Sequence, residues 1–169
     1  MKAFNTYCKC CDRMETLICG LLTIIFAVMT VISVTEVVRR YILGLSFPWA
    51  DELCRYLLVW LGFLGAAIAA RKGKLVKFDL GHDRLSERSR TMLAILVEVI
   101  SILFMAFIFY YSLRWATSFS ASKSKMLALP FTLRPVYMAV PVGVAFYILF
   151  VIEALGKSIL KLTNKGEQS

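Results

Sequence analysis

Four long apolar runs constrain this chain more than any other feature of its sequence. They cover residues 17–35, 56–70, 91–113 and 136–155. The first two contain no charged residue, and the third and fourth contain one acid each, Glu98 and Glu153. A helix rises about 1.5 Å per residue, so about 20 residues cross the roughly 30 Å of hydrocarbon in a bilayer. The runs therefore predict an all-α integral membrane protein with four transmembrane helices.

Composition supports this prediction, because 59% of the 169 residues are hydrophobic, only 18% are charged and the mean hydropathy is +0.72. A soluble domain would interleave its apolar residues with polar ones at helical spacing. We expect one membrane domain over 1–169 and a short amphipathic segment on the inner surface. The expected spans are about 15–40, 50–71, 88–114 and 135–157, with an inner loop at 71–90 and an outer loop at 115–134.

The distribution of Lys and Arg predicts the orientation. Of the 20 cations, 13 lie in the termini and the central loop, and six lie in the other two loops. Cytoplasmic loops carry the excess of Lys and Arg, so both termini are expected in the cytoplasm, with the chain in a bacterial inner membrane. The net charge of +9 is then explained by topology and by contact with anionic phospholipid, and it gives no reason to expect nucleic-acid binding.

The sequence offers little for cofactor chemistry or catalysis. It contains no P-loop, no glycine-rich nucleotide fingerprint and no HExxH motif. His82 is its one histidine, which excludes haem held by two histidines. Cys8, Cys10 and Cys11 lack a fourth ligand nearby, so they make a weak zinc site. We therefore expect no catalytic residue, no substrate-binding residue, no metal and no cofactor in this chain.

Polar and small residues share one face of the second span. Asp51, Arg55, Gly62, Ala66 and Ala69 follow one another at helical spacing. Either Asp51 or Glu52 can reach Arg55, and the small residues let another helix approach closely. The face can serve internal packing with a salt bridge, or it can dock a second protein. The full candidate interface comprises Asp51, Glu52, Arg55, Trp60, Gly62, Gly65, Ala66 and Ala69.

Ionisable residues inside a span need a partner or a function, and Glu98, Ser101 and Glu153 are the candidates here. Glu98 and Ser101 share a face of the third span. Glu98 can be neutral, paired with Arg71 or Lys72 at the inner membrane edge, or paired with another chain. A proton-coupling role for Glu98 gives an alternative function, namely a self-sufficient exporter that acts as a homodimer.

The stretch FPWADELCRYLLVWLGFLGAAIAARKGKLVKFDL, residues 47–80, resembles the small integral-membrane subunit of tripartite ATP-independent periplasmic (TRAP) transporters, the DctQ-like family. The resemblance rests on an aromatic residue, an acidic pair, an arginine and a VWL-x-FLGAA-x-A-x-R-x-G pattern. Length and four spans fit as well. The segment KLVKFD, residues 74–79, departs from the family, many members of which have a histidine there.

The resemblance implies a non-catalytic scaffold subunit. Its implied partners are a large membrane subunit, which carries the substrate and sodium sites, and a periplasmic binding protein that captures an organic acid anion such as a C4-dicarboxylate or sialic acid. Asp51, Glu52 and Arg55 would then form an outer polar cluster, and Arg71 would mark the inner edge. Four cations on the outer side are candidates for contact with the binding protein: Arg39, Arg40, Lys123 and Lys125. The alternative is that these side chains are simply solvated.

Overall fold

The computed structural model describes residues 2–72, 87–118, 126, 128 and 132–166, and these residues form long helices. Each long helix contains a segment that is long and apolar enough to cross a membrane, which confirms the predicted fold class. The helices are α1 (Lys2–Val38), α2 (Pro48–Arg71), α3 (Glu87–Ala116) and α5 (Arg134–Gly166). The predicted amphipathic inner segment falls mainly on residues outside the described part of the chain.

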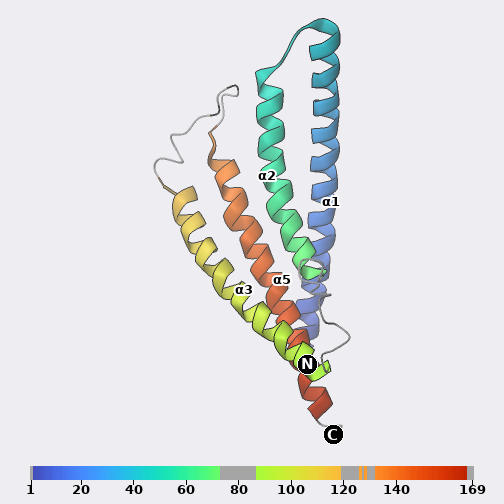
Figure 1. The fold of residues 1–169 in the computed structure, drawn as a ribbon, viewed down its shortest axis with the longest axis vertical. Coiled ribbons are helices and arrows are strands. Elements are labelled where there is room, and N and C mark those ends of the chain that lie inside the picture. Colours follow the sequence, from blue (N-terminus) through green and yellow to red (C-terminus); the bar gives the residue numbers. More distant parts are fainter. Residues whose placement is uncertain (1, 73–86, 119–125, 127, 129–131, 167–169) are drawn as a thin grey trace.

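The connection between α1 and α2 is built from local backbone preferences. A π-helical segment, Arg39–Leu43, continues α1 and ends at Gly44, whose φ of 65° favours a residue without a Cβ. Pro48 occupies the first turn of α2, where its missing N–H leaves no hydrogen bond unmade. The two helices therefore form an antiparallel hairpin at the end of the molecule opposite the two termini (Figure 1).

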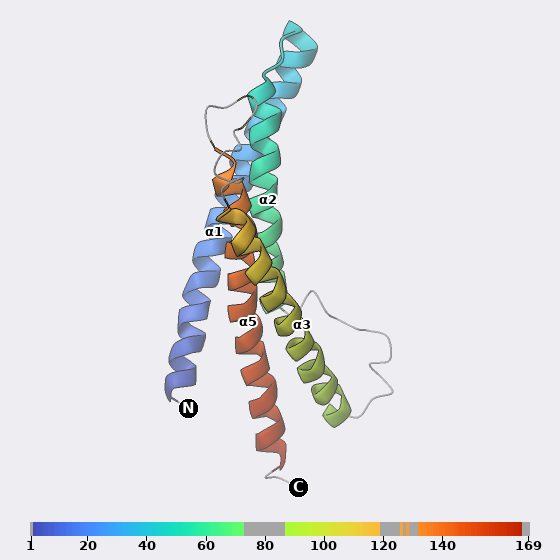
Figure 2. The ribbon, with the colours of Figure 1, turned by 90° about the vertical axis from the view of Figure 1, so that its left-hand side faces the viewer.

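The helices lie side by side in the order α3, α5, α2, α1 and do not close into a bundle (Figures 1 and 2). Among the described residues, α3 packs against α5 alone. The central helix α5 is correspondingly the most buried, with Ala139, Phe150 and Glu153 at 0–1% exposure. Large apolar side chains on the other helices remain exposed, as is usual where lipid or a partner covers them.

The best-packed region joins α1, α2 and α5 towards the end that carries the termini. Phe150 of α5 packs there with α1 and α2 residues, among them Leu64 and Ile68 of α2 and Ile18 of α1. Higher up, α2 and α5 cross closely, because a Cβ built on Gly143 would lie 2.5 Å from the Cβ of Phe63. This crossing and the terminal-end core fix α2 against α5.

Candidate functional site

An arginine at the end of α2 joins three helices at the terminal end of the molecule. The Arg71 Nε donates to Glu153 Oε2 over 2.9 Å, and one terminal nitrogen reaches Glu153 Oε1 at 3.2 Å and Asp12 Oδ1 at 2.6 Å. The other terminal nitrogen contacts Glu15. The guanidinium also lies 5.3 Å from the centre of the Phe150 ring. We call these residues and their neighbouring lysines the inner cluster.

The inner cluster is buried at its centre and balanced in charge. Arg71 is 8% exposed and Glu153 only 1%. Lys157 donates to Glu153 over 2.6 Å, and Lys72 pairs with Glu15 at 3.3 Å. Three carboxylates therefore meet three cations, so no buried charge lacks a partner. The cluster holds α1 and α5 to the last turn of α2.

A second cluster occupies the opposite end of the same helices. Arg40 donates to Asp51 over 2.9 Å, to Ser46 over 3.2 Å and to Glu36 over 3.3 Å. Glu36 Oε1 also accepts the Ser46 hydroxyl at 2.7 Å and the Phe47 amide at 3.0 Å. This outer cluster ties the end of α1 to the connection and to the first turn of α2.

The separation of the two clusters matches the thickness of a bilayer. Glu36 follows Glu15 by 21 residues on α1, and Arg71 follows Asp51 by 20 residues on α2. At about 1.5 Å per residue, both intervals correspond to roughly 30 Å of helix. We infer that the clusters mark the two edges of the hydrocarbon, where charged side chains are least costly.

One face of α2 is left open by the other helices. Asp51, Arg55, Leu58, Gly62 and Ala66 are exposed along it. A Cβ built on Gly62 or on Gly65 would meet no atom within 4 Å. The small residues therefore do not serve a crossing within the described chain, where Gly143 makes the close approach. We call this the open face of α2.

The acidic pair at the start of α2 has different partners from the one predicted. Among the described residues, neither Asp51 nor Glu52 forms an ion pair with Arg55, so that prediction is wrong. Asp51 pairs with Arg40, and Glu52 accepts the Tyr56 hydroxyl and the Ala128 amide. These partners lie on other segments or one turn along, which leaves Arg55 on the open face.

Other predicted interface residues divide between the core and the open face. Trp60 packs against the core cluster that contains Leu64 and Phe150, so it serves internal packing. Gly65 and Ala69 are half-buried beside the open face. The predicted α2 set therefore contains both packing residues and residues that none of the described helices covers.

The structure gives other partners to both cations suggested for Glu98, and Lys72 pairs with Glu15. Arg71 binds Glu153, Glu15 and Asp12, so pairing of Glu98 with Arg71 is wrong. Glu98 Oε1 instead faces the Ser158 hydroxyl at 3.3 Å, and its Oε2 is buried without a partner among the described residues. Ser158 lies beyond Glu153 towards the C-terminal end of α5. This places Glu98 near the inner cluster, away from the bilayer centre.

The remaining predicted polar residues lie at different places in the chain. Arg39 stacks over the Phe47 ring with its guanidinium carbon 3.8 Å from the ring centre. Ser101 is half-buried on α3. Lys123 and Lys125 lie outside the described residues. Among the described residues, no group of three or more His, Cys, Asp or Glu could hold a metal ion.

Sequence reasoning missed three acids that build the clusters: Asp12, Glu15 and Glu36. A signal was present, because Glu15 and Glu36 bracket the first uncharged run almost symmetrically. The pattern to seek is a span with an acid at each end, next to a span in which an acid and an arginine lie about 20 residues apart. The pairing itself joins residues 59 and 82 positions apart, which spacing does not reveal.

Substitution of Asp51 by alanine is expected to lower the free energy of unfolding by at most about 1 kcal/mol, because exposed ion pairs contribute little. The Arg40 and Asp51 side chains are 48% and 61% exposed. Thermal unfolding in detergent, compared with the wild type, measures the effect. A loss of several kcal/mol would contradict this account of the outer cluster.

Two ion clusters about one bilayer apart, joined by apolar helices, define a multi-pass membrane protein. Residues 29–160 match the family described as tripartite ATP-independent periplasmic transporters, DctQ component. The chain belongs to this family, and is thus an inner-membrane TRAP small permease subunit. The resemblance seen in the sequence is confirmed.

Individual relatives agree with the family. The chain is 30% identical over 155 residues to the ectoine TRAP transporter small permease protein TeaB of Halomonas elongata, covering 89% of this chain and 79% of TeaB. It is 33% identical over 102 residues to the C4-dicarboxylate TRAP transporter small permease protein DctQ of Rhodobacter capsulatus, covering 59% of this chain and 44% of that protein. A 99-residue match, 25% identical, to the isethionate TRAP transporter permease protein DctMQ of Oleidesulfovibrio alaskensis covers 57% of this chain and 15% of that protein.

Proposed function

We propose that this chain is the stationary scaffold of a sodium-coupled importer, in which it binds the large membrane subunit and helps to dock a periplasmic binding protein. Sodium coupling would lie in the large subunit, and both termini would face the cytoplasm. The proposed substrate is an organic acid anion of the C4-dicarboxylate or sialic acid type. The chain itself would carry neither substrate nor cofactor and would catalyse no reaction.

The named substrates of the relatives support a scaffold role. Small permease proteins similar to this chain are named for ectoine, C4-dicarboxylate and sialic acid. One type of subunit thus serves transporters of chemically different solutes, which fits substrate selection by other subunits.

The open face of α2 is the observation that carries the proposed association. Gly62 and Ala66 are exposed, and a Cβ on Gly62 would meet nothing within 4 Å. Helix association in lipid depends on close packing, which small residues permit. A helix of the large subunit is the proposed occupant, and the DctMQ relative, named as one permease protein, fits this association.

Charge placement favours a scaffold over a self-sufficient transporter. The charged residues of the described spans lie in the two end clusters or elsewhere towards the helix ends, and even Arg55 and Glu98 lie within a few turns of a helix end. A solute or proton pathway needs polar groups along the intervening 30 Å or so. The exporter alternative would depend on Glu98, which lies near one edge.

Co-purification with the proposed large membrane subunit tests the proposal. We expect a one-to-one complex in mild detergent, and Gly62→Leu with Ala66→Leu should reduce its recovery about tenfold, because overpacking costs about 1–3 kcal/mol. Gly20→Leu is the matched control. Gly20 is an exposed glycine of α1 with nothing within 4 Å of its Cβ position, and its variant should retain the complex.

The competing function makes the opposite prediction. A chain that ignores the large subunit, forms a stable homodimer and transports a solute alone in proteoliposomes would contradict the scaffold role. Glu98→Gln would then abolish that transport. If the double leucine variant leaves the complex intact, the scaffold role would stand. The interface would then lie elsewhere than on the open face of α2.

A further inference from the structure

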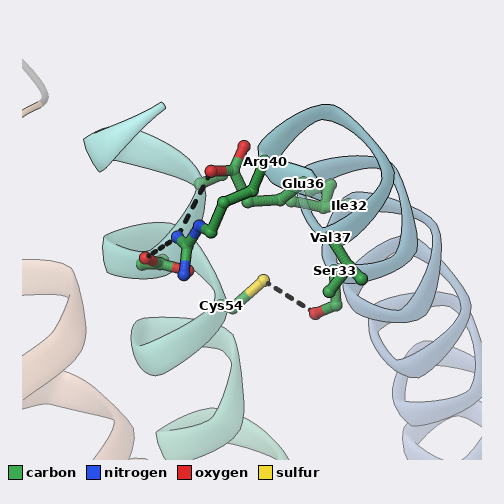
Figure 3. A pocket seen from close by; sticks show the side chains of 8 residues that line it. Ile32, Ser33, Glu36, Val37, Arg40 and Cys54 are labelled. Atoms are coloured by element: carbon green, nitrogen blue, oxygen red, sulfur yellow. Dashed lines mark hydrogen bonds and ion pairs between the residues drawn. The ribbon is translucent and has the colours of Figure 1, made fainter. Parts of the chain in front are cut away.

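A small cavity lies between α1 and α2 beside the outer cluster (Figure 3). Its volume is about 110 Å³, enough for a small polar group. Ile32, Val37 and Ala50 provide an apolar wall, and Glu36, Arg40 and Asp51 provide the charged lining. The lining of the cavity thus combines apolar and charged side chains.

One carboxylate oxygen of the charged lining has no hydrogen-bond donor among the described residues. Glu36 is 5% exposed, and its Oε1 already accepts three hydrogen bonds, whereas its Oε2 has no partner among the described residues. A buried carboxylate oxygen without a partner is costly. Two carboxylates face one guanidinium, so the lining carries a net charge of −1. A cationic group with N–H donors satisfies both the free oxygen and the charge.

A complementary unsatisfied donor lies close by. Phe47 links the two, because its amide donates to Glu36 and its ring lies under the Arg39 guanidinium. Arg39 forms no ion pair in the described part of the chain, and its buried Nε has no hydrogen-bond partner there. An acceptor such as phosphate suits this arginine. A zwitterionic ligand, with a cationic group for Glu36 and an anionic group for Arg39, therefore suits both residues.

The location of Glu36 relative to the membrane indicates which kind of zwitterion binds there. Glu36 follows directly after the first uncharged run, at the level where phospholipid headgroups lie. Val37 is 54% exposed beside it and offers an apolar surface to an acyl chain. Phosphatidylcholine matches the charges but has no N–H on its ammonium, so it cannot donate to Glu36.

We propose that this cavity is a binding site for a phospholipid with a primary ammonium headgroup, of the phosphatidylethanolamine type. The ammonium group donates to the free oxygen of Glu36, and the phosphate accepts from Arg39. The acyl chain lies against Ile32 and Val37. The lipid thereby fills the seam between α1 and α2 at the edge of the membrane.

Native mass spectrometry of the full chain in detergent tests this site with a methylation series. Equal amounts of phosphatidylethanolamine, its mono- and dimethylated forms and phosphatidylcholine are added separately. Retained lipid should fall as N–H groups are lost, with about a tenfold preference for phosphatidylethanolamine over phosphatidylcholine, since a charge-assisted hydrogen bond is lost. Glu36→Gln should remove the preference.

Matched variants separate the site from general lipid adhesion. Glu98→Gln removes another carboxylate with a free buried oxygen at the far end of the molecule and should keep the preference. Val37→Phe fills the cavity without touching a charge and should lower phosphatidylethanolamine retention, even if Glu36→Gln fails to fold. Equal retention of all four lipids, unchanged phosphatidylethanolamine retention in Val37→Phe, or equal binding of soluble glycerophosphoethanolamine would overturn the proposal.

Discussion

Replacement of Arg71 by methionine is expected to destabilise the chain by about 3–5 kcal/mol, because removal of one partner leaves a buried charge uncompensated. Glu153 is 1% exposed and takes two hydrogen bonds from Arg71. Lys157 alone then remains beside it. Thermal unfolding of the purified chain in detergent, followed by circular dichroism, should show the largest loss among single arginine variants.

Two further variants assign this loss to the buried pair. Arg55→Met removes an arginine from the open face and should leave the unfolding temperature of the isolated chain nearly unchanged. Arg71→Met combined with Glu153→Leu removes both charges and should recover much of the lost stability, since apolar residues often replace a buried ion pair well. An Arg71→Met protein that unfolds with the wild type would contradict the role assigned to the inner cluster.

The fold class could be predicted because the bilayer imposes it. A run of about 20 apolar residues can hardly satisfy its backbone in lipid except as a helix. The order of the helices could not be predicted in the same way. Residues 91–113 are apolar on nearly every side, so nothing in their periodicity shows that α3 packs against α5 alone.

The site could be predicted in part, for a related reason. Helical spacing correctly grouped Gly62, Ala66 and Arg55 on one face, because neighbours on a helix are fixed by its geometry. The partners of Asp51 and Arg71 come from other helices, so their choice depends on how the helices are arranged. The spacing along α2 suggested an ion pair between Asp51 and Arg55, whereas in the folded chain Asp51 pairs with Arg40.

Substitution of Gly143 by alanine is expected to destabilise the contact between α5 and α2 by about 1–3 kcal/mol, as overpacking does in a filled core. The added Cβ would lie 2.5 Å from the Cβ of Phe63, 3.0 Å from its carbonyl carbon and 3.2 Å from its oxygen. Backbone atoms cannot rotate away, so the two helices must separate. The unfolding temperature in detergent measures the loss, and Gly143→Val should lower it further.

The matched control is the same substitution at Gly62, one residue before Phe63 on the partner helix. A Cβ there meets no atom within 4 Å, so Gly62→Ala should be neutral or gain up to about 1 kcal/mol from helix propensity. Gly143→Ala should therefore lower the unfolding temperature of the isolated chain, whereas Gly62→Ala should not. Equal unfolding temperatures for the two variants would show that the α2–α5 crossing is looser than the Gly143–Phe63 contact requires. The distinction between the open face of α2 and its packed face would then be wrong.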